Sequence, residues 1–345
     1  MPAVPELPPR FWCYVHAALY AGKLNYPAIK QTTGIQNLDS SAYLDTPAPF
    51  PGISEQRAIA AFLDRETGRV DRLVAKKQQL IERLKEKRTA IISDCVTGKA
   101  EVRTKTNPDG TTSYYSVYPS VLPQKPSGLD WLGDIPAHWQ VKKLGYGAWL
   151  QGGYAFASET FDSEGVPVVR MNNLKRGVLD TSEANCIPPN ACLQDFALRK
   201  GDLLWGMSGS IGETGSLGNF ARVRAHDLPA QLNQRVGRFH VFQGSYSLDF
   251  LTYVIQTKMF YDQILLRVTG TAQFNVSSEQ VQSVKVPFPL QPEQAAIAAY
   301  LDVETAKLDA MAAKVETAVE RLQEYRTALI TAAVTGKIDV RKAAA

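Results

Sequence analysis

The densest cluster of small residues, Gly206-Met207-Ser208-Gly209-Ser210-Ile211-Gly212, is the first place to look for chemistry. Glycine-rich loops can present backbone N–H groups to phosphates. No Gly-Lys-Ser/Thr follows this run, however, and no Gly-x-Gly-x-x-Gly opens a helix after a strand. The run also lacks the Gly-x-Ser-x-Gly spacing of a hydrolase nucleophile. We interpret it as a series of tight turns and expect no nucleotide site.

Metal and methyl-transfer chemistry are not favoured by the remaining candidates. The histidines and cysteines form no pair at metal-ligand spacing, and such cysteines are typical of small buried side chains in a reducing compartment. They are His16, His138, His226, His240, Cys13, Cys95, Cys186 and Cys192. Ile187-Pro188-Pro189-Asn190 does not match the Asn/Asp-Pro-Pro-aromatic tetrad of adenine methyltransferases. The sequence predicts no catalytic residue, no metal ligand and no cofactor in this chain.

Polar side chains suited to reading DNA cluster at several predicted loops and strand ends. Arginine pairs bidentately with guanine and asparagine or glutamine with adenine, while serine and threonine hold phosphates. The candidates are Arg170, Asn172, Asn173, Ser208, Ser210, Gln231, Asn233, Gln234, Arg235, Thr271, Gln273 and Asn275. The alternative is that they are solvated loops or turn caps, and composition alone does not decide between the two.

Composition places the chain among folded proteins without a membrane partner. Hydrophobic residues make up 45% of its 345 residues, which is enough to fill real cores. We find neither an apolar run of about 18 residues nor the pattern of a signal peptide, and we expect a cytoplasmic protein. A net charge of +4 is compatible with nucleic acid but does not establish it.

These candidate loops must be positioned by larger elements, and an internal repeat shows what those are. Residues 50–103 recur as residues 288–341 at an offset of 238, with more than half of the aligned positions identical. Val96-Thr97-Gly98-Lys99, for example, matches Val334-Thr335-Gly336-Lys337. One chain therefore carries two copies of one element.

Each copy has the apolar spacing of a long helix. Steps of four and three define a heptad seam, and ~40 residues give a rod of roughly 60 Å. The predicted seam comprises Ile59, Leu63, Leu73, Leu80, Leu84 and Ile91, and then Ile297, Leu301, Leu308, Val315, Leu322 and Leu329. Both seams place a glutamate third, Glu66 and Glu304, which would be costly to bury unless paired. Ser54 is the expected N-cap of the first helix, and Gly98 and Gly336 suit the C-terminal ends.

An isolated heptad run would be interpreted as a helical hairpin or a homodimer zipper. Here the duplication favours two matched antiparallel helices within one chain. Between them, short β-type runs such as Val166–Arg170 and Val236–Val241 alternate with a helical segment at Leu248–Leu266. This mixture predicts an α+β fold class: one mixed α/β domain plus two long helices that form an antiparallel coiled coil.

The repeat continues weakly upstream of each helix. Phe11, Tyr14 and Val15 match Phe250, Tyr253 and Val254, so the first residues resemble the tail of a domain present in full only later. We expect five parts: residues 1–51 as this C-terminal remnant, 52–103 as the first helix, 104–126 as a connector with a small hairpin, 127–289 as the full domain, and 290–345 as the second helix and tail.

At this point the sequence closely resembles the DNA-specificity subunits of type I restriction-modification enzymes. The resemblance covers nearly the whole chain. It is carried by Gly128-Leu129-Asp130-Trp131-Leu132-Gly133-Asp134-Ile135-Pro136-Ala137-His138-Trp139, Gly152–Phe156, Lys200–Leu204, Ser208–Gly212, Gln231–Val236, and Pro289 through Glu293-Gln294. Each motif is weak alone, but together they are specific.

The resemblance implies a non-catalytic subunit in which each target-recognition domain reads half of a split site on double-stranded DNA. The paired helices would set the spacing and dock methyltransferase subunits, which motor and restriction subunits join. S-adenosylmethionine, ATP and Mg would then be held by those partners. Most of a first recognition domain is not represented, so a self-dimer reading a palindrome is one expectation. A remnant that binds methyltransferase subunits without specifying DNA is the alternative, and the recognised bases do not follow from the sequence.

Overall fold

The computed structural model describes residues 7–32, 35–212, 215–270 and 273–340. Contacts divide the chain into two compact units: Met1–Glu86 with Lys307–Ala345, called unit 1 here, and Lys87–Ala306, called unit 2. Each unit is described by itself. Within the described residues, no helix has the length and apolar character needed to cross a membrane.

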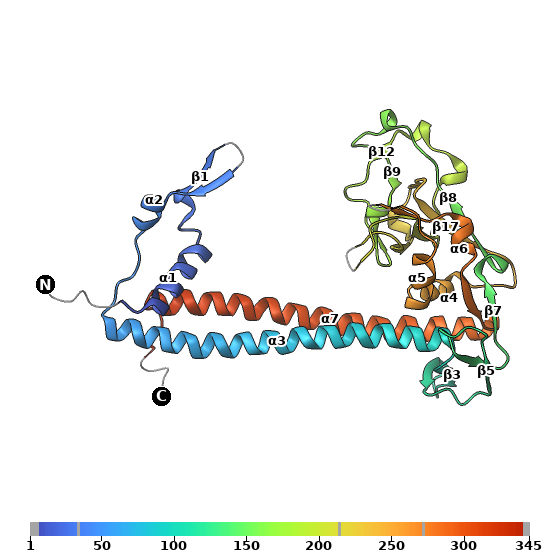
Figure 1. Ribbon diagram of the computed structural model, residues 1–345, viewed down its shortest axis with the longest axis horizontal. Coiled ribbons are helices and arrows are strands. Elements are labelled where there is room, and N and C mark those ends of the chain that lie inside the picture. Colours follow the sequence, from blue (N-terminus) through green and yellow to red (C-terminus); the bar gives the residue numbers. More distant parts are fainter. Residues whose placement is uncertain (1–6, 33–34, 213–214, 271–272, 341–345) are drawn as a thin grey trace. The chain divides into compact units, whose positions relative to one another are not determined.

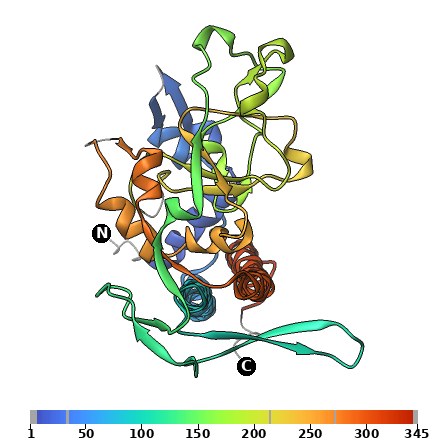
Figure 2. The ribbon, with the colours of Figure 1, turned by 90° about the vertical axis from the view of Figure 1, so that its right-hand side faces the viewer.

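Two long helices dominate both units. Helix α3 spans Ile53–Thr97 and helix α7 spans Gln291–Val334. Within each unit their segments run antiparallel and side by side (Figure 1, Figure 2). Both end before a glycine with positive φ, Gly98 at 77° and Gly336 at 72°, as the sequence predicts. Ser54 lies inside the first turn of α3 and is not its N-cap, because the helix already begins at Ile53.

The seam of α3 has a different phase from the predicted one. Leu63 and Leu84 are buried, but Leu73 and Leu80 are both 42% exposed. Their places on the inner face are taken by Val74, which is half-buried, and Ile81, which is buried. The predicted seam positions Leu73 and Leu80 are therefore wrong: the stripe continues from Leu63 by a step of four where we had expected three.

In α7 the six predicted seam residues all lie inward, and only the third position shifts as it does in α3. Ile297, Leu301, Leu308 and Leu329 are buried, and Val315 and Leu322 are half-buried. At the third position the inner residues are Thr67 and Thr305, whose hydroxyls each donate at 2.6 Å to the backbone carbonyl four residues back. Glu66 and Glu304 stay partly exposed beside them. The seam consequently contains no buried glutamate at this position.

The domain of unit 2 that the resemblance predicts to be a target-recognition domain, called the recognition domain below, is built from short strands around two small sheets. One sheet has the strand order β15-β13-β17-β8 and the other β12-β9-β16. Trp205 on β13 is fully buried and packs edge-on against Phe260, with the two ring centroids 6.2 Å apart. The strands are β7 (Gln140–Lys143), β8 (Ala148–Gly152), β9 (Val166–Val169), β10 (Leu174–Lys175), β11 (Val178–Leu179), β12 (Cys186–Ile187), β13 (Leu203–Gly206), β14 (Ser208–Gly209), β15 (Phe220–Arg222), β16 (Gln231–Leu232), β17 (Val236–Val241), β18 (Phe274–Asn275) and β19 (Lys285–Phe288).

Helices α4 (Leu248–Val254), α5 (Lys258–Leu265) and α6 (Ser278–Gln282) complete the domain. Phe250 and Val254 of α4 are fully buried in one core with Cys95 of α3 and Leu301 of α7. The Tyr253 hydroxyl donates to Asp302 Oδ1 at 2.5 Å. Burial and this carboxylate raise the pKa of Tyr253. The recognition domain is thereby joined to the helix pair by an apolar contact and one charge-assisted hydrogen bond.

The connector of unit 2 contains two antiparallel ribbons. β3 (Glu101–Thr106) pairs with β4 (Thr112–Val117) around the Asn107–Gly110 turn, and β5 (Gln124–Pro126) pairs with β6 (Asp134–Pro136). Ser116 contacts the Tyr300 hydroxyl at 2.8 Å, so the first ribbon is held against α7.

Unit 1 carries helix α1 (Pro9–Ala21), the hairpin of β1 (Ile29–Thr32) and β2 (Ile35–Leu38), and helix α2 (Ser40–Leu44). Phe11 and Val15 of α1 are buried against Leu63 of α3 and Ala333 of α7. The Tyr14 hydroxyl donates to Asp64 at 2.8 Å. This arrangement repeats the packing of α4 on the long helices of unit 2, which we call the joint, with Tyr14 and Asp64 in place of Tyr253 and Asp302.

The corrected seam makes a stability prediction for two adjacent residues. Ile81→Ala should destabilise the protein by about 2–4 kcal/mol, because it empties a buried site between the helices. Leu80→Ala, its matched control, should cost less than about 1 kcal/mol. Urea unfolding followed by circular dichroism measures both. Equal losses would contradict the assigned phase.

Candidate nucleic-acid interface

Three predicted DNA-contact residues from distant parts of the chain meet at one point of unit 2. The Arg235 guanidinium donates through Nη1 to Asn275 Oδ1 at 2.8 Å and to Ser208 Oγ at 3.3 Å. Ser208 and Asn275 face each other across the β14–β18 pair. We call Ser208, Arg235 and Asn275 the Arg235 cluster. Its arginine is exposed but held in place by two side chains.

Close backbone packing positions these loops. The Met207 N–H donates to the Arg235 carbonyl at 2.9 Å. At Gly153, an added Cβ would lie 2.3 Å from the Asn233 carbonyl oxygen, so only glycine allows β8 to approach this segment so closely. Gly209 has φ of 147°, and its Cβ would lie 2.0 Å from Ser216 Oγ. The glycine-rich run is therefore not the predicted series of tight turns: Gly206 ends β13 and Ser208–Gly209 form β14, and Gly209 permits close backbone packing there.

The Arg170–Asn173 turn lies beside the cluster. Ser208 Oγ donates to Met171 Sδ at 2.8 Å, which brings this turn and β14 together. Arg170 is half-buried with its guanidinium over the Phe161 ring at 4.4 Å, and Asn172 is exposed. Four separate segments of the sequence therefore converge on a single polar surface.

Several predicted contact residues are buried and support the backbone instead. Gln231 is 3% exposed and accepts the Leu193 N–H at 3.1 Å. Asn173 is 3% exposed, accepts the Arg170 N–H at 2.8 Å and donates to the Asp180 carbonyl. Asn233 accepts the Arg235 N–H at 3.3 Å. These side chains, like buried Ser208, do not face solvent, because each satisfies a polar group of the fold.

The remaining predicted residues are accessible. Ser210, Gln234 and Gln273 are exposed, and Asn275 is half-buried. Thr271 lies outside the described residues. The accessible polar surface is therefore smaller than predicted and is centred on Arg235.

Sequence reasoning did not single out a second polar site around Arg238 on β17. Its guanidinium is buried and donates to Gln151 Oε1 at 2.6 Å and to Asp202 Oδ2 at 3.2 Å. His240 stacks on Trp149 with ring centroids 4.4 Å apart. Burial and the nearby Arg238 lower the pKa of His240, which favours its neutral form. The sequence signal was an arginine and a histidine, Arg238 and His240, within a mostly apolar strand.

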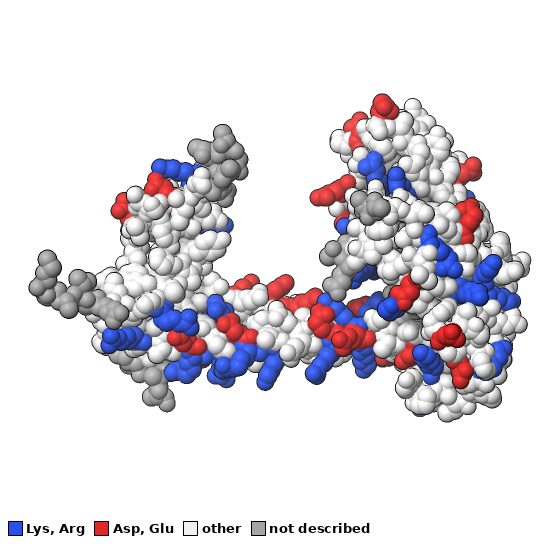
Figure 3. Space-filling model, in the orientation of Figure 1, with Lys and Arg blue, Asp and Glu red and all other residues white. Residues whose placement is uncertain are grey.

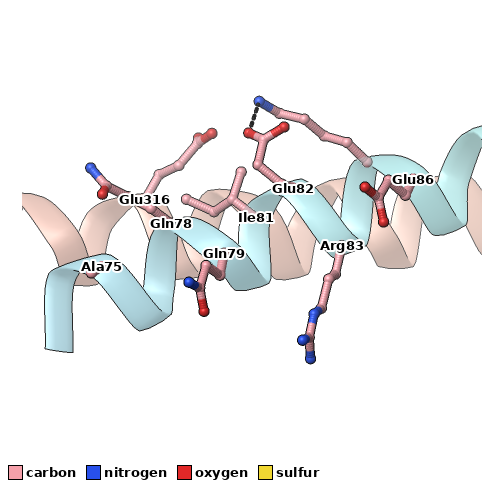
Figure 4. Close-up of a pocket in the computed structure, with 9 residues that line it drawn as sticks. Ala75, Gln78, Gln79, Ile81, Glu82, Arg83, Glu86 and Glu316 are labelled. Atoms are coloured by element: carbon pink, nitrogen blue, oxygen red, sulfur yellow. Dashed lines mark hydrogen bonds and ion pairs between the residues drawn. The ribbon is translucent and has the colours of Figure 1, made fainter. Parts of the chain in front are cut away.

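The surface of the helix pair in unit 1 does not indicate a catalytic pocket. A shallow hollow of about 860 Å³ in unit 1 is lined by α3 residues and by Glu316 of α7. Figure 4 shows Glu82 in its ion pair with Lys85 on one side of the helix, while Gln79 and Arg83 point outward on the other. Among the described residues, no group of three or more histidine, cysteine or acidic side chains could hold a metal ion.

A small α+β domain with an arginine-centred polar surface, joined to a pair of long duplicated helices, defines the class of a recognition subunit. The chain belongs to the family described as the type I restriction modification DNA specificity domain, which it matches over residues 136–321. Specificity subunits are the non-catalytic members of these systems, and we assign this chain accordingly.

Curated relatives agree with this family. The chain is 23% identical over 327 residues to the type I restriction enzyme MjaVIII specificity subunit of Methanocaldococcus jannaschii, covering 93% of this chain and 70% of that protein. It is 28% identical over 191 residues to the EcoBI specificity subunit of Escherichia coli, covering 55% of this chain but only 37% of that protein. The chain thus represents a limited share of the bacterial relative.

A solved structure shares the fold. It is described as the structural basis of complex assembly and conformational transition of the type I R-M system. It aligns with a TM-score of 0.69 at 15% identity, over 95% of this chain and 71% of that one. At this identity the comparison supports the α+β fold with long helices, and nothing finer.

The burial of Gln231 gives a testable distinction from its exposed neighbour Gln234. Gln231→Ala should lower the free energy of unfolding by about 1–3 kcal/mol, because the Leu193 N–H would lose its acceptor. Gln234→Ala should change it by less than about 0.5 kcal/mol. Denaturant titration of both variants measures the difference, and an unaffected Gln231→Ala protein would contradict the structural role.

Proposed function

We propose that the recognition domain of unit 2 reads one half-site of double-stranded DNA through the surface around the Arg235 cluster. The observation that carries this proposal is the exposed Arg235 guanidinium, oriented by Asn275 and Ser208 on a domain of the specificity family. A pre-oriented guanidinium fork can donate bidentately to guanine O6 and N7. Exposed Asn172, Ser210 and Gln273 supply further base or phosphate contacts around it.

The same proposal assigns the helix pair of unit 1 to the methyltransferase subunits. Leu73 and Leu80 of α3 lie seven residues apart and are exposed, as is Met311 of α7. Figure 3 shows lysine and arginine side chains along the helices, and those of α3 include exposed Arg69, Arg72 and Lys76. Apolar side chains with a charged rim suit helical partners. S-adenosylmethionine belongs to those subunits, and ATP and Mg to the motor and restriction subunit that joins them.

Removing the guanidinium tests the DNA-reading role. Arg235→Ala, assayed with the methyltransferase subunits, should lose about 1–3 kcal/mol of discrimination, roughly 10- to 100-fold, at one base pair of the half-site. Gln273→Ala should lose selectivity to a smaller degree. Lys200→Ala is the control, because Lys200 is exposed at the opposite end of β13 from Ser208. Methylation kinetics on matched and single-mismatch duplexes measure the effect.

Footprinting separates this function from its alternative. A half-site reader protects one sequence, and its affinity falls steeply with salt because phosphate contacts release counterions. Assembly with the methyltransferase without any sequence-selective protection would identify an interaction protein instead. Two unrelated protected half-sites would also overturn the proposal.

The docking role makes a separate prediction. Leu73→Asp should prevent co-purification with the methyltransferase subunits while leaving the urea midpoint nearly unchanged, because Leu73 is outside the seam. Val303→Asp, at an exposed position of unit 2, is the matched control and should retain binding. If Leu73→Asp still copurified at the wild-type ratio, this face would not be the docking surface.

A further inference from the structure

Tyr154 is an exposed aromatic residue whose backbone adjoins the segment that carries Arg235. It follows β8 and is 45% exposed. Its N–H donates to the Leu232 carbonyl at 3.0 Å, and its carbonyl accepts the Gln234 N–H at 3.0 Å. Because Gln234 directly precedes Arg235, the tyrosine lies on the same part of unit 2 as the proposed DNA-reading surface.

The preceding glycine fixes this placement. The Gly153 N–H donates to the Val236 carbonyl at 3.2 Å, so residues on both sides of Arg235 are hydrogen-bonded to this segment. An added Cβ on Gly153 would lie 2.4 Å from the Leu232 carbonyl oxygen, and only glycine allows the two segments to lie this close. The backbone of Tyr154 is therefore held in one position relative to Arg235.

Two other rings hold the Tyr154 side chain. Phe156 packs edge-on against it with ring centroids 5.1 Å apart, and Phe196 packs at an angle with centroids 5.5 Å apart. Both phenylalanines are half-buried. A single exposed apolar side chain is ordinary at a protein surface and needs no explanation. A ring that is packed against two others has less freedom to move, and the rest of this ring is accessible to a ligand.

Buried Arg238 fixes the segment that supports Tyr154. Its guanidinium donates to the carbonyl of Asp195 at 2.9 Å and to that of Ala197 at 2.8 Å, the two residues on either side of Phe196. Hydrogen bonds from an ionised donor are stronger than those between neutral groups. The Phe196 ring, and with it the Tyr154 ring, is therefore supported by a rigid backbone segment.

The chemistry of duplex DNA limits what such a ring can contact. The faces of the bases are stacked inside the duplex. Their edges in the major groove present hydrogen-bonding groups and one apolar group, the C5-methyl of thymine. The face of an aromatic ring does not replace a hydrogen-bond partner, but it gains from covering a methyl group. The Arg235 cluster supplies polar contacts, and Tyr154 supplies an apolar one beside them.

We propose that Tyr154 recognises a thymine of the half-site through contact between its ring and the C5-methyl group. The inference rests on the proposed function, because it places Tyr154 and Arg235 on the same duplex. It adds a specificity-determining residue that reads an apolar feature of the DNA.

The test is a double-mutant cycle between the tyrosine and the methyl group. The chain is assembled with methyltransferase subunits, and each thymine of a selectively methylated duplex is replaced in turn by uracil, which lacks only the C5-methyl group. For the wild-type complex, kcat/KM should fall about three- to fivefold at one thymine, the effect of losing one buried methyl contact. Tyr154→Ala should lower kcat/KM on the thymine duplex by a similar factor, with no further fall on the uracil duplex.

Two variants control for the hydroxyl and for general surface effects. Tyr154→Phe keeps the ring and should keep the wild-type ratio of thymine to uracil rates. Tyr146→Ala removes a tyrosine that is 74% exposed on the same domain, and it should also keep that ratio. The ratio compares two duplexes on one protein preparation, so a partly unfolded variant does not change it.

Two results would overturn the inference. One is a wild-type complex that methylates every uracil duplex at the thymine rate. The other is a Tyr154→Ala complex that keeps the wild-type ratio, because its loss would then come from a phosphate contact or from folding. Failure of the proposed function is a different result: methylation would show no sequence selectivity on any duplex, whereas failure of this inference leaves selectivity intact.

Discussion

The structure depends on the packing of one short helix against the paired long helices. In unit 2, Phe250 and Val254 fill the space between α3 and α7, and the Tyr253 hydroxyl donates to Asp302. The Tyr253 hydroxyl is buried and would be destabilising without this acceptor, whereas Asp302 itself is exposed and can be solvated. The joint therefore fixes the orientation of the recognition domain on the helices by polar geometry as well as by apolar burial.

The duplication extends this constraint to both units. Because α3 and α7 are copies of one element, each unit has the same contact between a short helix and a long one: Tyr14 meets Asp64 in unit 1, and Tyr253 meets Asp302 in unit 2. The two units differ in the strand pairing of the segment that follows the short helix, residues 36–50 in unit 1 and 274–288 in unit 2. In unit 2 the strands β18 and β19 of that segment pair with β14 and β7 of the recognition domain, whereas in the described part of unit 1 β2 pairs with β1.

The sequence predicted the architecture better than the individual surfaces. Helix ends followed from glycine, since Gly98 and Gly336 adopt the positive φ that other residues resist. The strands at Val166–Val169 and Val236–Val241 also followed from apolar spacing. The expected helix at 248–266 is broken between α4 and α5, where Thr257 caps a new helix. The seam phase failed because Leu73 and Val74 both suit an interior, and only packing against α7 selects between them.

The prediction of individual contact residues in the candidate interface was limited for a similar reason. Gln231 and Gln234 are alike in type and lie three residues apart, yet one holds a backbone N–H and the other faces solvent. Residue type cannot separate these roles, because the same amide group can hydrogen-bond to the backbone of a loop or to the edge of a base. The Arg235 cluster was likewise invisible to spacing, since its members are brought together only by the β14–β18 pair.

The residues that hold the recognition domain on the helices are different from the residues that surround Arg235. Mutations around Arg235 alter a surface without touching Phe250, Tyr253 or Val254, which are held in the core of the joint. The hydrogen bond between Tyr253 and Asp302 thus places no constraint on which side chains surround Arg235.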